Sequence, residues 1–491
     1  MKKLLDLAMD FQSISGKVKV TEPDWVKVIR KNSFEQYSKL PDEVSPLYSK
    51  YTNANRLNYD EIFFESDYLE NESSHEFDER IKELESETGV FTIGNTIKRI
   101  FISDDLKKQG VVISSLSDAF LSHGDLIKKN WTKNKINLQE DKYLALENAY
   151  FQSGIFVYIP KNVVISEPIR LISSLSKSGS SLISRNIIIA DTNSKATIVQ
   201  ELYSSLTNPD HKKDEITTDI EGLATKDLHK QQQSLFELVE CHVNAEAALE
   251  MVTLQAFSEN GVHFSNKKGF IEKDGKMSWY AGLFGGKLTR YKVDNIMNGS
   301  GAYGEDVEIV LGMDTQSFDI TSNLHHEGPH SKGRVQVKSV MKDTSQSLFK
   351  GMIKIGHDAK ASESFLAGHA ILLDKGAKSD AIPGLEILTN EVKATHSASV
   401  AQIDESQIFY LMCRGLSREE AKREIVNGFL EPLSRRMGPT LRAWVNYLIE
   451  NKWAGKSLRI KTDDVMERIL EVEKSRYRET QDLFEKHYKY R

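Results

Sequence analysis

The pattern that decides the fold lies in residues 307–340, which read VEIVLGMDTQSFDITSNLHHEGPHSKGRVQVKSV. Val307–Leu311 and Arg334–Val340 read as short strands with a side-chain period of two, and Gly, Asp, Asn and Ser break the chain between them. The same pattern of short strands and breaking residues extends from Phe156 to Gln402, with a strand roughly every 10 to 12 residues and almost no helical periodicity. Such spacing is typical of a sandwich, a barrel or a β-solenoid. Periodicity alone leaves these open, although a stacked solenoid would explain so many short rungs.

Other patterns flank this β region. Thr21-Glu22-Pro23-Asp24 reads as a helix start within a mixed segment, and Ser417–Glu420 reads as a capping box within a helical one. We therefore expect a mixed α/β domain over residues 1–150, a β core over 151–403 and a helical domain over 404–491. The polar residues 206–234, rich in Lys, Asp and Gln, are predicted to form a flexible insertion in the core.

Composition excludes several classes of protein. The chain has 491 residues, of which 39% are hydrophobic and 28% charged, and its net charge is −6, so a nucleic-acid partner is not expected. Two cysteines, Cys241 and Cys413, rule out a disulfide framework and argue against a metal site made of thiolates alone. Asp6 and Asp10 interrupt the apolar start of the chain, and no run of about 18 apolar residues follows. We expect a cytoplasmic protein without a membrane partner.

One motif resembles a zinc site. His326-Glu327-Gly328-Pro329-His330 matches HExxH, which binds zinc when a helix places both histidines on one face. Gly328 and Pro329 stand where that helix would have to continue, and a proline there costs about 3 kcal/mol. A polar turn is the favoured interpretation. A β-helix hydrolase that uses zinc at His326 and His330 stays open as the least favoured alternative.

Two glycine motifs resemble nucleotide-binding loops. Gly299–Gly304 matches GxGxxG, but a strand-like run follows it where the dinucleotide fold requires a helix. Gly285-Gly286-Lys287-Leu288 lacks both the first glycine of a phosphate loop, which is Ala281 here, and its Ser or Thr. We expect that this chain binds no nucleotide.

Histidines gather in the last third of the β region, where a solenoid could bring several together on one face. Imidazole suits both iron and zinc, and the alternative for each residue is a hydrogen-bonded position in a rung. These histidines are His325, His326, His330, His357, His369 and His396.

Several stretches resemble the SufB/SufD family of iron–sulfur cluster assembly proteins. Glu22–Trp25 resembles its N-terminal region, and residues 141–161 resemble its entry into the β domain. The strongest similarity runs from Ile382–Ile387 through Val392–His396 to Phe409–Leu411. The family motif residues fall on Pro329, Lys338, Gly351 and Arg414.

This resemblance implies a mainly β protein: a right-handed parallel β-helix between an N-terminal α/β domain and a C-terminal helical domain. It also implies a scaffold without turnover of its own, in a complex with a SufB-type paralogue and a SufC-type ATPase. A transient Fe–S cluster would be shared with the paralogue. His396 is the candidate cluster ligand, with His326 as a second candidate metal ligand. The residues expected to contact the ATPase are Phe409, Tyr410, Phe429, Pro432 and Leu433.

Within the family, four positions bear on the choice between SufB and SufD. Leu202 and the neighbourhood of Gly368 align with cysteines of SufB, and Ser397 stands where SufB tends to have Glu, so the sequence is closer to SufD. Ala394 replaces a cysteine that many SufD proteins carry, which leaves His396 as the remaining ligand in that motif. The alternative is a SufB-like scaffold that pairs with its own copy.

Overall fold

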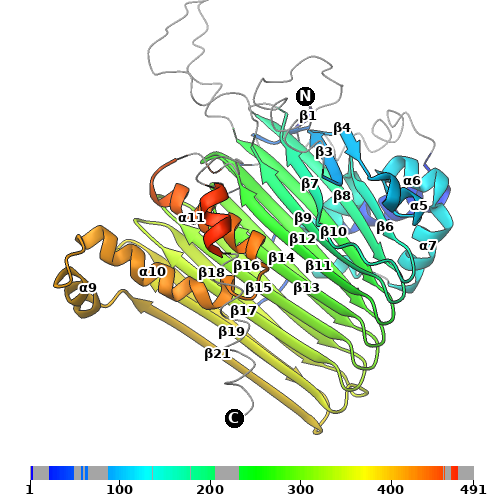
Figure 1. Ribbon diagram of the computed structural model, residues 1–491. Coiled ribbons are helices and arrows are strands. Elements are labelled where there is room, and N and C mark those ends of the chain that lie inside the picture. The colour runs from blue at the N-terminus through cyan, green and yellow to red at the C-terminus, as the bar shows by residue number, and fades with distance from the viewer. Residues whose placement is uncertain are drawn as a thin grey trace, which may run out of the picture.

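The computed structural model describes residues 2–3, 22–48, 57–58, 61–64, 87–134, 136–176, 179–204, 232–456, 458 and 466–473. Its centre is a parallel β-solenoid, and helices lie against it on two sides (Figure 1). The expected class, a β-helix between an α/β region and C-terminal helices, is confirmed. No helix among the described residues is long and apolar enough to cross a membrane.

The solenoid is built from two sheets, and the chain alternates between them. Within the described residues, one sheet has 11 strands and the other 10, and all neighbouring strands of the coils pair in parallel. Sheet A contains β8 (Ser180–Ala190), β10 (Gln233–Val243), β12 (Gly261–Ile271), β14 (Leu288–Met297), β16 (Ser317–His326), β18 (Gln346–Ile355) and β20 (Lys378–Ile387). Sheet B contains β7 (Ile169–Ser174), β9 (Lys195–Tyr203), β11 (Ala248–Ala256), β13 (Lys276–Leu283), β15 (Tyr303–Gly312), β17 (Lys332–Met341), β19 (Ser362–Leu372) and β21 (Val392–Gln402).

The strand register gives the size of one coil. Most coils hold from 26 residues, from Val262 to its partner Leu288, to 32 residues, from Gln346 to its partner Lys378. The coil that contains the predicted insertion is longer, with 53 residues from Ser181 to its partner Ser234. Each coil holds two strands, so strands recur less often than the sequence pattern predicted. The strands are longer than the apolar runs in the sequence, because they also include polar residues that face the inside of the solenoid.

The turns from sheet A to sheet B repeat one backbone conformation. In each, one residue has a positive φ and donates its N–H to a carbonyl in the turn of the next coil; examples are Gly301 to Pro329 (3.0 Å) and His330 to Lys360 (2.8 Å). The GxGxxG motif, which contains Gly301, and the HExxH motif, which ends at His330, are therefore two of these turns. The turn residues are Asn193, Glu246, Asp274, Gly301, His330 and Ala361.

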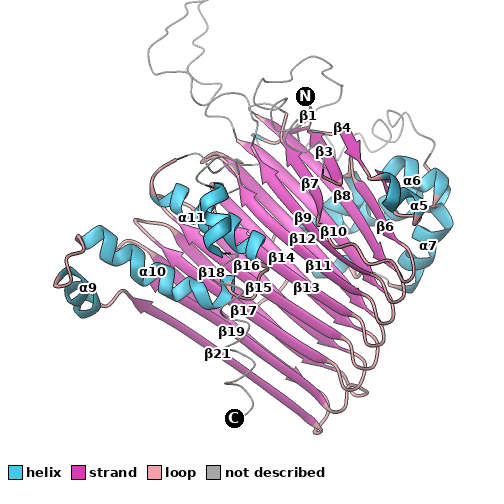
Figure 2. Cartoon of the chain, viewed as in Figure 1, coloured by secondary structure: helices cyan, strands magenta, loops and turns pink. Residues whose placement is uncertain are grey.

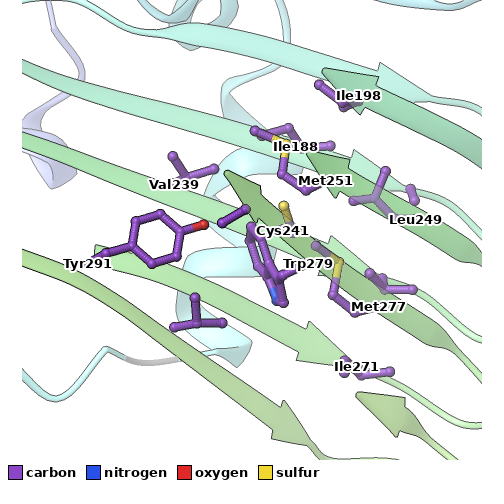
Figure 3. Packing of buried hydrophobic residues seen from close by; sticks show 14 of the residues in the cluster. Ile188, Ile198, Val239, Cys241, Leu249, Met251, Ile271, Met277, Trp279 and Tyr291 are labelled. Carbon is purple, nitrogen blue, oxygen red and sulfur yellow. The ribbon is translucent and has the colours of Figure 1, made fainter. Parts of the chain in front are cut away.

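Apolar side chains stack in columns between the two sheets. Because parallel partners point to the same face of a sheet, one column on sheet B runs through Ile198, Met251 and Trp279, all of them buried. Figure 3 shows these side chains facing Cys241 and Tyr291 of sheet A. The thiol of Cys241 is thus a core group, and burial raises its pKa.

Helices of the N-terminal region cover the outer face of sheet A. Their aromatic residues pack edge to face, with the ring centroids of Trp25 and Trp131 5.0 Å apart, above Phe156 and Phe236 of the sheet. The N-terminal helices are α3 (Asp24–Tyr37), α5 (Asp104–Lys108), α6 (Leu116–Ser122), α7 (Gly124–Lys133), η3 (Leu138–Glu140) and α8 (Lys142–Tyr150). Two of the N-terminal helices, α6 and α7, meet at His123. The N-terminal strands extend the two sheets: β1 (Lys2–Lys3), β2 (Phe63–Phe64), β5 (Val112–Ser115) and β6 (Ile155–Ile159) belong to sheet A, and β3 (Gly89–Ile93) and β4 (Thr96–Phe101) to sheet B.

The C-terminal helices cover the outer face of sheet B, as the cyan ribbons in front of the magenta strands show (Figure 2). They are α9 (Glu405–Met412), α10 (Arg418–Ser434) and α11 (Pro439–Trp453). The predicted capping box is present, since the side chains of Ser417 and Glu420 each bond the other's backbone N–H. Pro432 does not break α10, because it lies in the last turn of that helix.

The predicted insertion lies mostly outside the described residues, which resume at residue 232. β10 begins at Gln233, so the last two residues assigned to the insertion belong to a strand.

Candidate functional site

The last coil, formed by β20 and β21, is the uncovered end of the solenoid. Each of these strands ends its sheet, so within the described residues each has a neighbour on one side only. A strand edge without a neighbour presents N–H and C=O groups that can pair with another chain. Exposed apolar side chains lie on the same coil and just after it: Leu385, Ile387, Leu388 and Val400.

His396 lies on β21 in one of the interior columns. Its parallel partner on β19 is Leu366, whose partner on β17 is Val335, and both of these are fully buried. His396 points to the same side as they do but is exposed, because no further coil covers it within the described residues. The imidazole therefore stands at the mouth of the solenoid interior.

His326 has a different environment. It is fully buried at the end of β16, and its two ring nitrogens lie 2.8 Å from Ser331 Oγ and 3.0 Å from Ser364 Oγ. Burial lowers its pKa to about 4. Both nitrogens are thus engaged by hydroxyl groups, and the helix that HExxH chemistry needs is absent from this described segment. Nor do the described residues contain a group of three or more His, Cys, Asp or Glu side chains placed to hold a metal ion.

The motif residues hold the architecture together. Pro329 accepts a turn hydrogen bond from Gly301, and Gly351 leaves space that the side chain of Leu366 fills. On the outer face of sheet B, Lys338 donates to the carbonyl of Phe429 and lies 4.6 Å from the centre of its ring. Lys338 therefore fastens α10 to β17.

A polar ladder missed by sequence reasoning continues from Lys338 across sheet B. The strand register aligns Lys338 with His369 and then Ser399, and His369 Nδ1 lies 2.7 Å from Ser399 Oγ. Burial, followed by the charge of Lys338, lowers the pKa of His369. The sequence signal was available in principle, because the three residues recur at the coil interval.

The predicted partner-binding residues separate into two groups. Phe409 and Tyr410 on α9 are 68% and 58% exposed, and Arg414 Nη2 donates to Tyr410 Oη at 3.0 Å. Leu433 instead is buried against sheet B, and Phe429 is partly buried in the same cluster, so these two belong to the core of the protein. Pro432 is exposed next to them.

Ionisable side chains also face the solenoid interior. Near its start, Glu237 is paired, with Oε1 3.3 Å from Lys267 Nζ and 2.7 Å from Ser265 Oγ. Farther along, Asp306 and Glu308 point inward from β15, and Ser322 Oγ donates to Glu308 at 3.1 Å. No lysine, arginine or histidine of the described residues lies within ion-pair distance of that second pair of acids, which therefore has no counter-charge.

Comparison with known proteins fits this arrangement. The family model for the SufBD protein N-terminal region matches residues 1–171, and the model for the SufBD core domain of SUF system FeS cluster assembly matches residues 172–429. This chain belongs to the SufBD family. It is 29% identical over 418 residues to the iron–sulfur cluster assembly protein SufD of Bacillus subtilis, covering 84% of this chain and 90% of that protein. SufBD family proteins of Staphylococcus aureus and Staphylococcus saprophyticus are each 25% identical, over 449 and 448 residues, covering 88% of this chain and 90% of theirs.

Two further positions bear on the choice between SufB and SufD. Leu202, the position expected to correspond to a SufB cysteine, is buried against Leu182 and Leu235. A side chain at Gly368, near the other such position, would collide with the ring of Phe349. A leucine therefore stands at the first position and the second has no room for a side chain, which agrees with the similarity to SufD.

Proposed function

We propose that this chain is a SufD-like, non-enzymatic scaffold subunit in a cytoplasmic complex that assembles iron–sulfur clusters. The observation that carries the proposal is the position of His396 at the uncovered mouth of the solenoid. A nascent cluster is the substrate of such a complex. His396 would be one of its ligands, with the remaining ligands supplied by a partner.

The partner at the last coil is a SufB-type paralogue. Two features support this. The edges of β20 and β21 offer backbone groups to another strand, and the exposed apolar residues there supply area to bury. The same edge could pair with a second copy of this chain, so a homodimeric, SufB-like scaffold is the second candidate.

The ATPase partner docks on α9. Phe409 and Tyr410 stand on one short helix with their rings largely in solvent, and aromatic anchors of this kind dominate helix-mediated interfaces. The hydrolase alternative has no support, since His326 has no ring nitrogen left for zinc.

The experiment is co-expression of the chain with its cognate ATPase and SufB-type paralogue, followed by affinity purification and anaerobic cluster reconstitution. Phe409→Asp should remove the ATPase and keep the paralogue, and Val400→Asp should do the reverse. His396→Ala should keep both partners and lower cluster yield severely. Leu121→Asp is the matched control, because Leu121 is 66% exposed on α6, away from both surfaces.

Each variant tests a separate part of the proposal and can contradict that part alone. Unchanged ATPase recovery with Phe409→Asp would remove α9 as the dock. Full cluster yield with His396→Ala in an intact complex would exclude this imidazole as a required ligand. A complex that forms without any paralogue, with this chain in two copies, would favour the homodimer.

A further inference from the structure

Three serine hydroxyls form a hydrogen-bonded network with His326 inside the solenoid. His326 Nδ1 lies 2.8 Å from Ser331 Oγ, and His326 Nε2 lies 3.0 Å from Ser364 Oγ. Ser331 Oγ also lies 2.8 Å from Ser362 Oγ, and all four residues are buried. The network therefore extends from the turn after β16 to the interior face of β19, one coil before His396.

The direction of each hydrogen bond follows from a carbonyl group at one end of the network. Ser331 donates its single hydroxyl hydrogen at 2.9 Å to the carbonyl of Gly328, a group that can only accept. His326 must then donate from Nδ1 to Ser331, which leaves Nε2 of the neutral ring as an acceptor. Burial lowers the pKa of His326 to about 4 and so favours the neutral ring. Ser364 therefore donates to His326 Nε2, and its oxygen can only accept from any other group.

The fold leaves room for the bond between His326 and Ser364 at Gly333. Gly333 is the register partner of Ser364 on β17. A Cβ at this position would lie 2.9 Å from His326 Nε2 and 3.0 Å from Ser364 Oγ. A side chain there would force one of the two groups to move, so the glycine keeps the imidazole and the hydroxyl at hydrogen-bonding distance.

Ser364 lies on the interior face that continues to the mouth of the solenoid. Its register partner on β21 is Ala394, which is only partly buried, and His396 follows two residues later on the same face. One strand spacing and two residues along a strand place the Cα atoms of Ser364 and His396 about 8 Å apart. A hydroxyl and an imidazole can bridge that distance directly or through one water. Within the described part of the chain, the Ser364 oxygen accepts no hydrogen bond, and the His396 ring makes none.

We infer that Ser364, oriented by His326, accepts a hydrogen bond from the free ring N–H of His396 when that ring binds a nascent cluster. A histidine that ligates a metal donates its other ring N–H to an acceptor, which fixes the tautomer and the orientation of the ring. Because Ser364 can only accept on that side, it selects the imidazole form whose lone pair points to the cluster. Ser364 is thus a positioning residue, and its assignment rests on the proposed role of His396 as a cluster ligand.

Iron loss from the intact complex tests this assignment. The complex of this chain with its ATPase and paralogue is reconstituted anaerobically, and transfer of ferrous iron to bathophenanthroline disulfonate is followed. Ser364→Ala should lose iron about 10- to 100-fold faster than the wild type, the range typical for loss of a hydrogen bond to a metal-bound histidine. Ser364→Thr keeps the hydroxyl and should restore most of the wild-type behaviour. Ser347→Ala is the matched control and should change nothing, because this buried serine of the same coil donates to Ser379 and not to a histidine.

A double variant separates a failure of this assignment from a failure of the proposed function. In a chain that carries His396→Ala, Ser364→Ala should have no further effect, because the hydrogen bond has already lost its donor. An equal effect of Ser364→Ala with and without His396 would overturn the assignment. An unchanged rate for Ser364→Ala, when His396→Ala alone accelerates iron loss, would also overturn it while leaving the proposed function intact. No effect of His396→Ala would overturn the proposed ligand and, with it, the role of Ser364.

Ring ¹⁵N NMR of the full-length chain, labelled at histidine, tests the hydrogen-bond direction without altering Ser364. The His326 signals are assigned by the shift that Ser331→Ala causes, since Ser331 contacts its Nδ1. We expect Nδ1 to be protonated and Nε2 to accept at pH 7. The opposite tautomer would make Ser364 accept from His326 and donate towards His396, and would overturn the assignment.

Discussion

Asp306 and Glu308 should make the stability of the protein depend on pH in a definite direction. Both acids are fully buried inside the solenoid, and no basic group of the described residues pairs with them. Burial raises the pKa of Asp306, and burial together with the charge of Asp306 raises the pKa of Glu308. Burial therefore favours the protonated form of both carboxyl groups in the folded chain, and Ser322 donates a hydrogen bond to Glu308.

The sign follows from proton binding. In the unfolded chain the two groups ionise near their ordinary values, about 3.9 and 4.3. Above those values the folded state binds more protons than the unfolded state, so stability falls as pH rises towards the raised folded pKa values. Each acid that stays protonated in the folded state contributes a slope of about 1.4 kcal/mol per pH unit, or roughly 2.7 kcal/mol between pH 5 and pH 7.

The variant Asp306→Asn/Glu308→Gln keeps the shape of both side chains and removes both titrations. Urea unfolding of the wild type and the variant from pH 5 to pH 8 should give curves that diverge, with the variant gaining relative stability at every step. Asp343→Asn, at a turn where Asp343 also has a positive φ, is the control and should run parallel to the wild type. Parallel curves for the double variant as well would refute the assignment of neutral interior acids.

Three further outcomes are expected. Leu366→Ala should lower the free energy of unfolding by about 2 to 5 kcal/mol, because the side chain is fully buried. His396→Ala, next in the same column, should lower it by under about 1 kcal/mol. Equal losses would contradict the exposed position of His396 at the end of the solenoid. Gly368→Ala should destabilise the protein by about 1 to 3 kcal/mol through its collision with Phe349, and Phe349→Leu should restore part of that loss, as measured by thermal unfolding. The purified chain should show no ATP hydrolysis that survives further chromatography, because its glycine motifs are turns.

The alternation of residues 307–311 predicted strands correctly but does not show which face is inside. Period two alone would bury Val307, Ile309 and Leu311 in the interior and leave Glu308 in water. In the structure those three pack outward, under the C-terminal helices, and Glu308 faces inward. Both faces of the strand are covered, so local sequence carries no signal for the choice, which depends on helices more than a hundred residues later.

The helical region shows the same limit. The capping box at Ser417 is local, and sequence reasoning placed it correctly. Leu433 was expected to face the ATPase but packs on sheet B, because which side of α10 is buried depends on the strands beneath it. For the same reason, removing residues 431–491 would uncover the apolar face of sheet B, so point substitutions on α9 are the cleaner test of docking.

The parallel stacking of the coils has a consequence for the local unfolding of the molecule. Most coils are held by two neighbours, but within the described residues the coil of β20 and β21 has only one, so its local unfolding requires the least free energy. Amide exchange should therefore be fastest there and slow progressively towards β12. A subunit that stacks on this end would give the coil of β20 and β21 a second neighbour, as the internal coils have. Partner binding would therefore slow amide exchange several coils away, without any change in the structure of those coils.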